Sequence, residues 1–138
     1  MNVFYEEAGV FKVGSILADN TTSLQIEATH GKRLKIKAAS IFLRFEAPPL
    51  VEFMQQAQTI VDELDVVFLW EYCAEKNEFS ASELAADYFG HAPQPVETAA
   101  TLILLNSNPI HFHKRGHGRY LAAPPEILQA ALAGREKK

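Results

Sequence analysis

The residues best suited to chemistry lie in one short stretch, Ile110 to Tyr120, which reads IHFHKRGHGRY. It combines cations with aromatic rings and two glycines, a mixture that can contact phosphate groups and stack on planar bases. The candidate contact residues are Phe112, Lys114, Arg115, His117, Arg119 and Tyr120. The two aromatic residues are expected to stack on bases beside the cations. The alternative is a solvated hairpin tip whose aromatic side chains pack on neighbouring helices.

A second basic stretch, HGKRLKIK, runs from His30 to Lys37. Its candidate contact residues are Lys32, Arg33, Lys35 and Lys37. Because successive side chains of a strand point to opposite faces, Lys35 and Lys37 are expected to share one face. This stripe favours a polyanionic partner. The alternative is that the lysines discourage pairing of an exposed edge strand with another sheet.

The charge is distributed unevenly along the 138 residues. The net charge is −4, which argues against a surface that binds nucleic acid over its whole extent. Between Ala28 and Phe45 there are five basic residues and no acid, whereas Glu46 to Glu97 contains eleven acids and a single base, Lys76. Two basic segments around an acidic middle predict a polarised surface that can bind a polyanion despite the net sign.

The sequence offers little support for catalysis or for a metal site. We expect no catalytic residues and no cofactor, because phosphate-binding glycine loops, nucleophile elbows and paired-carboxylate motifs are lacking. His111, His113 and His117 are close in sequence, but the hairpin supplies no cysteine or carboxylate to complete a zinc site. The single cysteine, Cys73, lies among apolar residues and is expected to be a buried, unreactive thiol in a reducing compartment. With no membrane-spanning run and no signal peptide, a cytoplasmic location is expected.

Residues 1–47 are predicted to form a small β-sheet or barrel-like domain. Short apolar-rich segments predict strands at 3–6, 10–18 and 41–45, and alternating apolar and polar residues predict strands at 23–29 and 34–37. Turns are expected at Asp19–Thr22 and at His30–Gly31. A unit this small buries little surface, so it is expected to need the following segment for stability.

Residues 48–125 are predicted to form a winged helix-turn-helix domain, which makes the chain α+β. Pro48 and Pro49 mark the boundary, and four helices follow, from 50 to about 64, from 66 to about 76, from 81 to 90 and from 95 to 105. Asp65 and a Ser80–Glu83 capping box are the expected helix starts. The fourth helix is almost wholly apolar, so it is expected to pack in the core rather than read a DNA groove. Residues 126–138 are predicted to be a last helix, which ends at about Ala133, and a polar tail.

The chain resembles the N-terminal region of bacterial ribonuclease II-type exoribonucleases of the RNB family. The segments that carry the resemblance are FKVGSILADN, HGKRLKIKA and KRGHGRYLAAPPE. The resemblance implies a small β domain and a winged helix that help to guide single-stranded RNA. It also implies that a catalytic domain follows, which degrades RNA from the 3′ end with magnesium, so that magnesium is expected only there. The expected partners are therefore single-stranded RNA and that catalytic domain, with no membrane.

Two other hypotheses stay open. The same scaffold can serve as a protein-interaction or dimerisation module, which the apolar fourth helix and the acidic middle would suit. A sequence-specific DNA-binding regulator would need a fourth helix richer in Arg, Lys, Asn or Gln.

Overall fold

The computed structural model describes residues 1–7, 10–47 and 49–136. The chain divides into two compact units, Met1–Thr59 (unit 1) and Ile60–Lys138 (unit 2). The division falls inside the first helix, α1 (Leu50–Glu63), so the N-terminal part of this helix belongs with the β structure. The predicted boundary residue Pro48 and the tail residues Lys137 and Lys138 lie outside the described residues.

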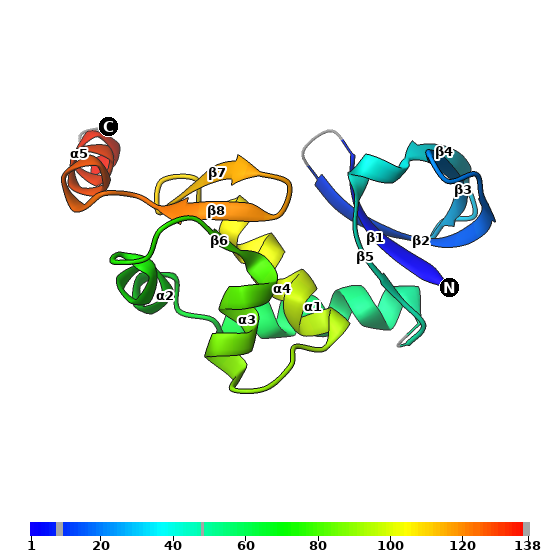
Figure 1. The fold of residues 1–138 in the computed structure, drawn as a ribbon, viewed down its shortest axis with the longest axis horizontal. Coiled ribbons are helices and arrows are strands. Elements are labelled where there is room, and N and C mark those ends of the chain that lie inside the picture. Colours follow the sequence, from blue (N-terminus) through cyan, green and yellow to red (C-terminus); the bar gives the residue numbers. More distant parts are fainter. Residues whose placement is uncertain (8–9, 48, 137–138) are drawn as a thin grey trace. The chain divides into compact units, whose positions relative to one another are not determined.

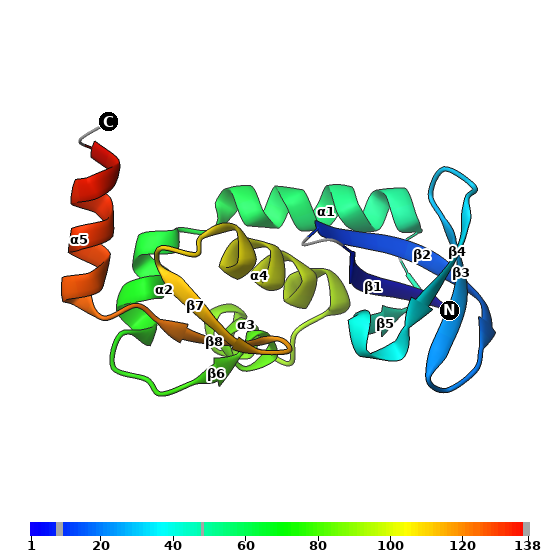
Figure 2. The same cartoon turned by 90° about the horizontal axis from the view of Figure 1, so that it is seen from above.

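Unit 1 contains one antiparallel sheet of five strands, and the sequence predicted all five. The strands are β1 (Asn2–Glu7), β2 (Val10–Asp19), β3 (Ser23–Ala28), β4 (Arg33–Lys37) and β5 (Ile41–Phe45), and the 3-10 helix η1 (Ala38–Ser40) joins the last two. Their order is β4-β3-β2-β1-β5 (Figures 1 and 2). In the described residues β4 and β5 do not pair, so the sheet does not close into a barrel.

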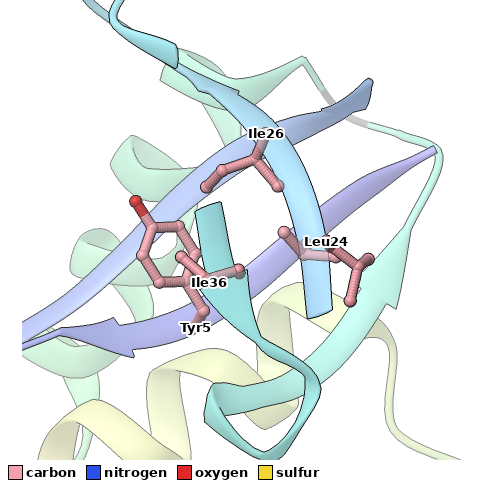
Figure 3. Packing of buried hydrophobic residues seen from close by; sticks show 5 residues of the cluster. Tyr5, Leu24, Ile26 and Ile36 are labelled. Atoms are coloured by element: carbon pink, nitrogen blue, oxygen red, sulfur yellow. The ribbon is translucent and has the colours of Figure 1, made fainter. Parts of the chain in front are cut away.

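Both faces of this sheet are covered by apolar side chains. One face carries a cluster of Val3, Tyr5, Leu24, Ile26 and Ile36, drawn in part in Figure 3. On the opposite face, Phe53 of α1 stacks on Phe45 with ring centroids 3.8 Å apart and lies 6.0 Å from Phe4. Because β1 is buried on both faces, three successive residues of this strand, Val3, Phe4 and Tyr5, are fully buried.

The predicted turn at Asp19–Thr22 is present, but the left-handed residue in it is Thr21, with φ 69°. The Asp19 carboxylate accepts a hydrogen bond from the Thr21 amide at 2.9 Å, which holds the turn. A β-branched residue is strained at positive φ.

We therefore expect Thr21→Gly to stabilise unit 1 by about 0.5–1 kcal/mol, because relief of strain exceeds the entropy cost of glycine. Chemical denaturation measures the change. Thr22→Gly is the matched control, since Thr22 is not left-handed, and it should destabilise the protein.

Unit 2 is built from helices and one small sheet. After α1 come α2 (Val66–Cys73), β6 (Phe79–Ser80), α3 (Ala81–Phe89), α4 (Pro95–Ser107), β7 (Phe112–Gly116), β8 (Arg119–Ala122) and α5 (Pro125–Glu136). The three strands are antiparallel, in the order β6-β8-β7. We call the β7–β8 hairpin the wing.

The predicted helix caps are confirmed. The Asp65 side chain accepts from the amides of Val67 and Phe68, which begins α2. Ser80 and Glu83 form the reciprocal capping box of α3. Gly90 ends the same helix in a left-handed conformation, at φ 76°.

Two elements differ from the prediction. The two-residue strand β6 was not predicted, because its pairing with β8 is a long-range contact that leaves no local periodicity. Helix α5 continues to Glu136 instead of ending near Ala133.

Helix α4 supplies much of the core of unit 2. Its buried residues are Val96, Ala99, Ala100, Thr101, Leu102, Leu104 and Leu105. Even the polar Thr101 is buried, and its hydroxyl donates to the Glu97 carbonyl at 2.9 Å. The prediction that this helix packs rather than reads bases is thus confirmed for the residues that the structure describes.

Candidate nucleic-acid interface

One predicted site is the outer face of the edge strand β4. Arg33, Lys35 and Lys37 are exposed, whereas Leu34 and Ile36 point into unit 1, so the cations share one face as predicted. Lys32 precedes them in the turn, where its carbonyl accepts from the Ala28 amide at 2.8 Å. We call these four cations the basic edge.

Neighbouring acids compensate little of this charge. Arg33 lies 4.0 Å from Glu27, which faces it across the β3–β4 pair. Lys35 and Lys37 lie opposite the neutral residues Gln25 and Ser23 and form no ion pair within the described residues. Two adjacent, uncompensated lysines on an exposed face suit a row of phosphates.

The two units differ in charge. Unit 1 holds six acidic and six basic residues, whereas unit 2 holds eleven acidic and seven basic residues. The net negative charge of the chain therefore belongs to unit 2. Repulsion of a polyanion is weaker around the basic edge than around the wing.

The wing, the other predicted site, exposes four of its six candidate residues: Lys114, Arg115, His117 and Arg119. Gly118 turns the chain at φ 70°, and its carbonyl accepts from the Ala81 amide at 3.0 Å. This bond holds the turn of the wing at the N-terminus of α3.

Arg119 has another partner than the one predicted. Its Nε donates to Glu78 Oε1 at 2.8 Å, and Nη1 lies 3.7 Å from Glu83. Two carboxylates thus compensate the guanidinium and fix the return strand of the wing to the start of α3. This contact reduces what Arg119 can offer to a phosphate.

The expectation that Phe112 and Tyr120 stack on bases is wrong for this structure. Each is 1 % exposed, and Phe112 packs edge-on against Phe79 with ring centroids 6.2 Å apart. Alternation in a two-stranded hairpin leaves open which face is buried, and here the aromatic face covers the helices. The wing therefore offers cations and backbone groups, without a stacking platform from these two rings.

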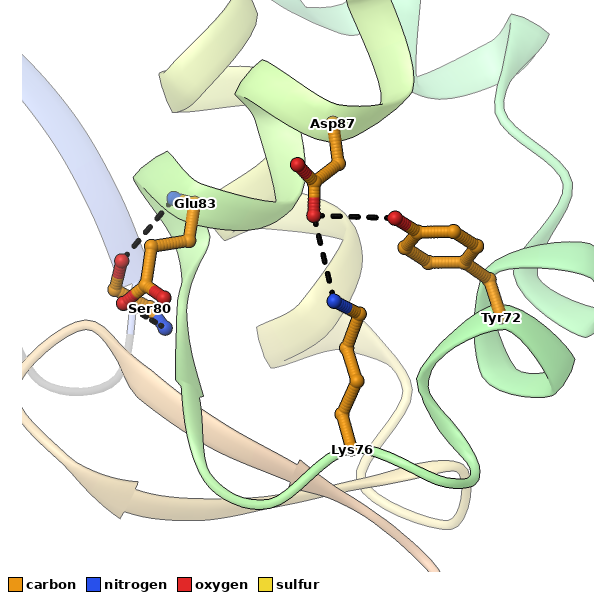
Figure 4. A network of polar contacts seen from close by, with 5 residues as sticks. All are labelled: Tyr72, Lys76, Ser80, Glu83 and Asp87. Atoms are coloured by element: carbon orange, nitrogen blue, oxygen red, sulfur yellow. Dashed lines mark hydrogen bonds and ion pairs between the residues drawn. The ribbon is translucent and has the colours of Figure 1, made fainter.

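Lys76, the single base of the acidic segment from Glu46 to Glu97, lies in a local network of polar contacts (Figure 4). The Tyr72 hydroxyl donates to Asp87 at 3.1 Å, and Lys76 Nζ lies 3.4 Å from the same carboxylate. Lys76 also lies 4.9 Å from the centre of the Tyr72 ring. This network joins α2 to α3.

Nothing in the described ranges brings three or more His, Cys, Asp or Glu side chains together in a way that could hold a metal ion. The thiol of Cys73 is buried as predicted, and burial raises its pKa to about 11.

A raised pKa keeps the thiol protonated, so we expect Cys73 to react slowly with disulfide reagents at pH 8. The rate should be on the order of 100-fold below that of the denatured chain, whose thiol titrates near its ordinary value. Absorbance of the released chromophore measures both rates. Equal rates would contradict the buried position.

The helices, the small sheet and the hairpin of unit 2 define a winged helix-turn-helix domain. The model of the family described as "Ribonuclease II, winged helix domain" matches residues 52–127, more than half of the chain. The chain therefore belongs to this family. A search of curated proteins found no match. Across the residues that the structure describes, no helix is both long and apolar enough to cross a membrane.

Proposed function

We propose that this chain is a single-stranded RNA-binding accessory region of a 3′-to-5′ exoribonuclease of the ribonuclease II type. The observation that carries the proposal is the basic edge, a row of exposed cations on one strand face, in a chain of this family. The wing tip adds a second set of cations. We assign no catalytic step to these residues, and we expect hydrolysis and its magnesium to belong to a catalytic domain elsewhere in the protein.

The chemistry of the basic edge favours contact with a phosphate backbone over recognition of particular bases. Lysines on a strand contact phosphates as point charges, and such contacts carry no base specificity. The buried helix α4 offers no row of polar side chains to a major groove. Binding should therefore depend on charge and strandedness, with weak dependence on sequence.

Fluorescence anisotropy with a labelled single-stranded RNA tests the proposal. We expect micromolar affinity at low salt. The logarithm of the affinity should fall linearly with the logarithm of the salt concentration, by about 0.7 for each phosphate that the protein neutralises. A duplex of the same length should bind more weakly. Absence of binding at low salt would contradict the proposal.

A second candidate function, protein interaction, rests on exposed aromatic side chains of unit 2. Phe68 and Tyr88 are 53 % and 40 % exposed, and their ring centroids lie 6.3 Å apart. Exposed aromatic residues are enriched in protein interfaces. If this surface mediates self-association, sedimentation will show a dimer that Phe68→Ser converts to a monomer.

A further inference from the structure

Unit 1 contains a pocket of about 530 Å³, a size typical of small-ligand sites. It lies where β3 separates from β2. The two strands pair from Asp19↔Leu24 to Gly14↔Ala28, whereas in the described residues Val10 to Val13 pair with β1 alone. This leaves an open edge of β2 beside the β3–β4 turn, and the first turns of α1 line another side of the pocket.

Tyr5, one of the residues around the pocket, carries a buried hydroxyl without a hydrogen-bond partner among the described residues. Tyr5 is fully buried, and its Oη makes no hydrogen bond to any described residue. Buried hydroxyls nearly always have a partner, because an unsatisfied one is costly. In Figure 3 the hydroxyl points away from the side on which Leu24 lies. Burial, and then the charge of Glu7, raises the pKa of Tyr5, so the hydroxyl keeps its proton as a donor.

The remaining lining combines apolar walls with cations. Phe11, Leu34 and Met54 supply apolar surface, and Lys12, His30 and Lys32 supply exposed basic groups. Lys12 is held by Glu7 at 3.1 Å, whereas Lys32 forms no ion pair within the described residues. Lys12, Lys32 and Met54 have long flexible side chains that can adjust around a ligand.

This combination fits a planar ring with polar edges that carries a negative group. The ring fills the apolar space and the negative group meets Lys32. An edge atom of the ring pairs with Tyr5 Oη once the side chains that cover this hydroxyl move aside. From Lys32 the basic edge continues along β4, so a phosphate is the negative group that best suits this end of the pocket.

We propose that this pocket binds one nucleotide, with its base against the apolar walls and Tyr5 Oη, and its phosphate at Lys32. The choice of a nucleotide rests on the proposed RNA-binding function. The source is either a free mononucleotide or one nucleotide of a bound RNA.

The test titrates the ¹⁵N-labelled chain with adenosine and uridine 5′-monophosphates, with adenosine and inorganic phosphate as controls. We expect the mononucleotides to shift the amide resonances of Lys12, Thr29 and Leu34, and each control to bind more weakly. Tyr5→Phe should weaken nucleotide binding about fivefold to tenfold, because one hydrogen bond is lost from a buried position.

The same substitution should raise the melting temperature by a few degrees, since it removes an unsatisfied buried group. If Tyr5 had only a structural role, the substitution would not weaken nucleotide binding while it raised the melting temperature. Lys32→Gln should also weaken binding, whereas Gln56→Glu, which changes the net charge equally on an exposed helix position outside the pocket, should not.

Anisotropy with RNA and the same variants separates the two sources and the two proposals. Loss of RNA affinity in Tyr5→Phe supports a nucleotide of RNA in the pocket. Mononucleotide binding without RNA binding supports a free nucleotide and overturns the RNA-binding function. RNA binding that is unaffected by Tyr5→Phe, with no mononucleotide shifts, overturns the pocket proposal and leaves the RNA-binding function standing.

Discussion

Lys35→Gln with Lys37→Gln is expected to weaken binding of single-stranded RNA about tenfold at 50 mM salt. These two side chains stand on one exposed face of β4 and form no ion pair within the described residues. Each should neutralise one phosphate, so the slope of log affinity against log salt should fall by about 1.4. Anisotropy titrations at several salt concentrations give both quantities.

A variant with the same net charge serves as the control. Gln56→Glu with Gln129→Glu also lowers the net charge by two, at exposed positions of α1 and α5. Because its new charges lie outside the basic edge, affinity should change less than twofold and the salt slope should stay the same. If the two variants weakened binding equally, the effect would come from net charge rather than from a site on β4.

The edge position of β4 gives its lysines an alternative role. Lysines on an edge strand discourage pairing with another sheet, and β4 is an edge of the five-stranded sheet. If the lysine variant aggregated at high concentration while binding RNA with unchanged affinity, this protective role would replace the RNA-binding one. Light scattering of the same samples measures the aggregation.

Phe53→Ala is expected to destabilise unit 1 by about 3–5 kcal/mol. Phe53 is fully buried, stacks on Phe45 and contacts the region of Phe4, so its removal leaves a cavity between α1 and the sheet. A five-stranded unit with so small a core has little stability to lose. Circular dichroism during chemical denaturation measures the change.

Gln56→Ala is the control on the same helix, because Gln56 is exposed and alanine is a good helix former. Its stability should stay within about 0.5 kcal/mol of the parent. A loss in Phe53→Ala no larger than this would show that the sheet does not depend on α1.

The elements of the fold could be predicted from the sequence because their determinants are local. Alternation marked β3 and β4, and the side chains of Asp65, Ser80 and Glu83 marked helix starts that the structure confirms. The same local pattern placed Lys35 and Lys37 on one exposed face. The apolar composition of α4 likewise sufficed to predict its burial.

The contacts between elements were decided only by the tertiary structure. Alternation assigns Phe112 and Tyr120 to one face or the other of their strands, but it does not say which face is buried. Nothing near Arg119 in sequence indicated its pairing with Glu78. The pocket depends on where β3 leaves β2, and on α1 lying beside that edge. The sequence by itself thus determined the strands, the helices and the exposed basic edge, whose causes lie within a few residues. Only the folded chain decided which cations are compensated and where Tyr5 Oη lies, because those depend on residues that are distant in sequence.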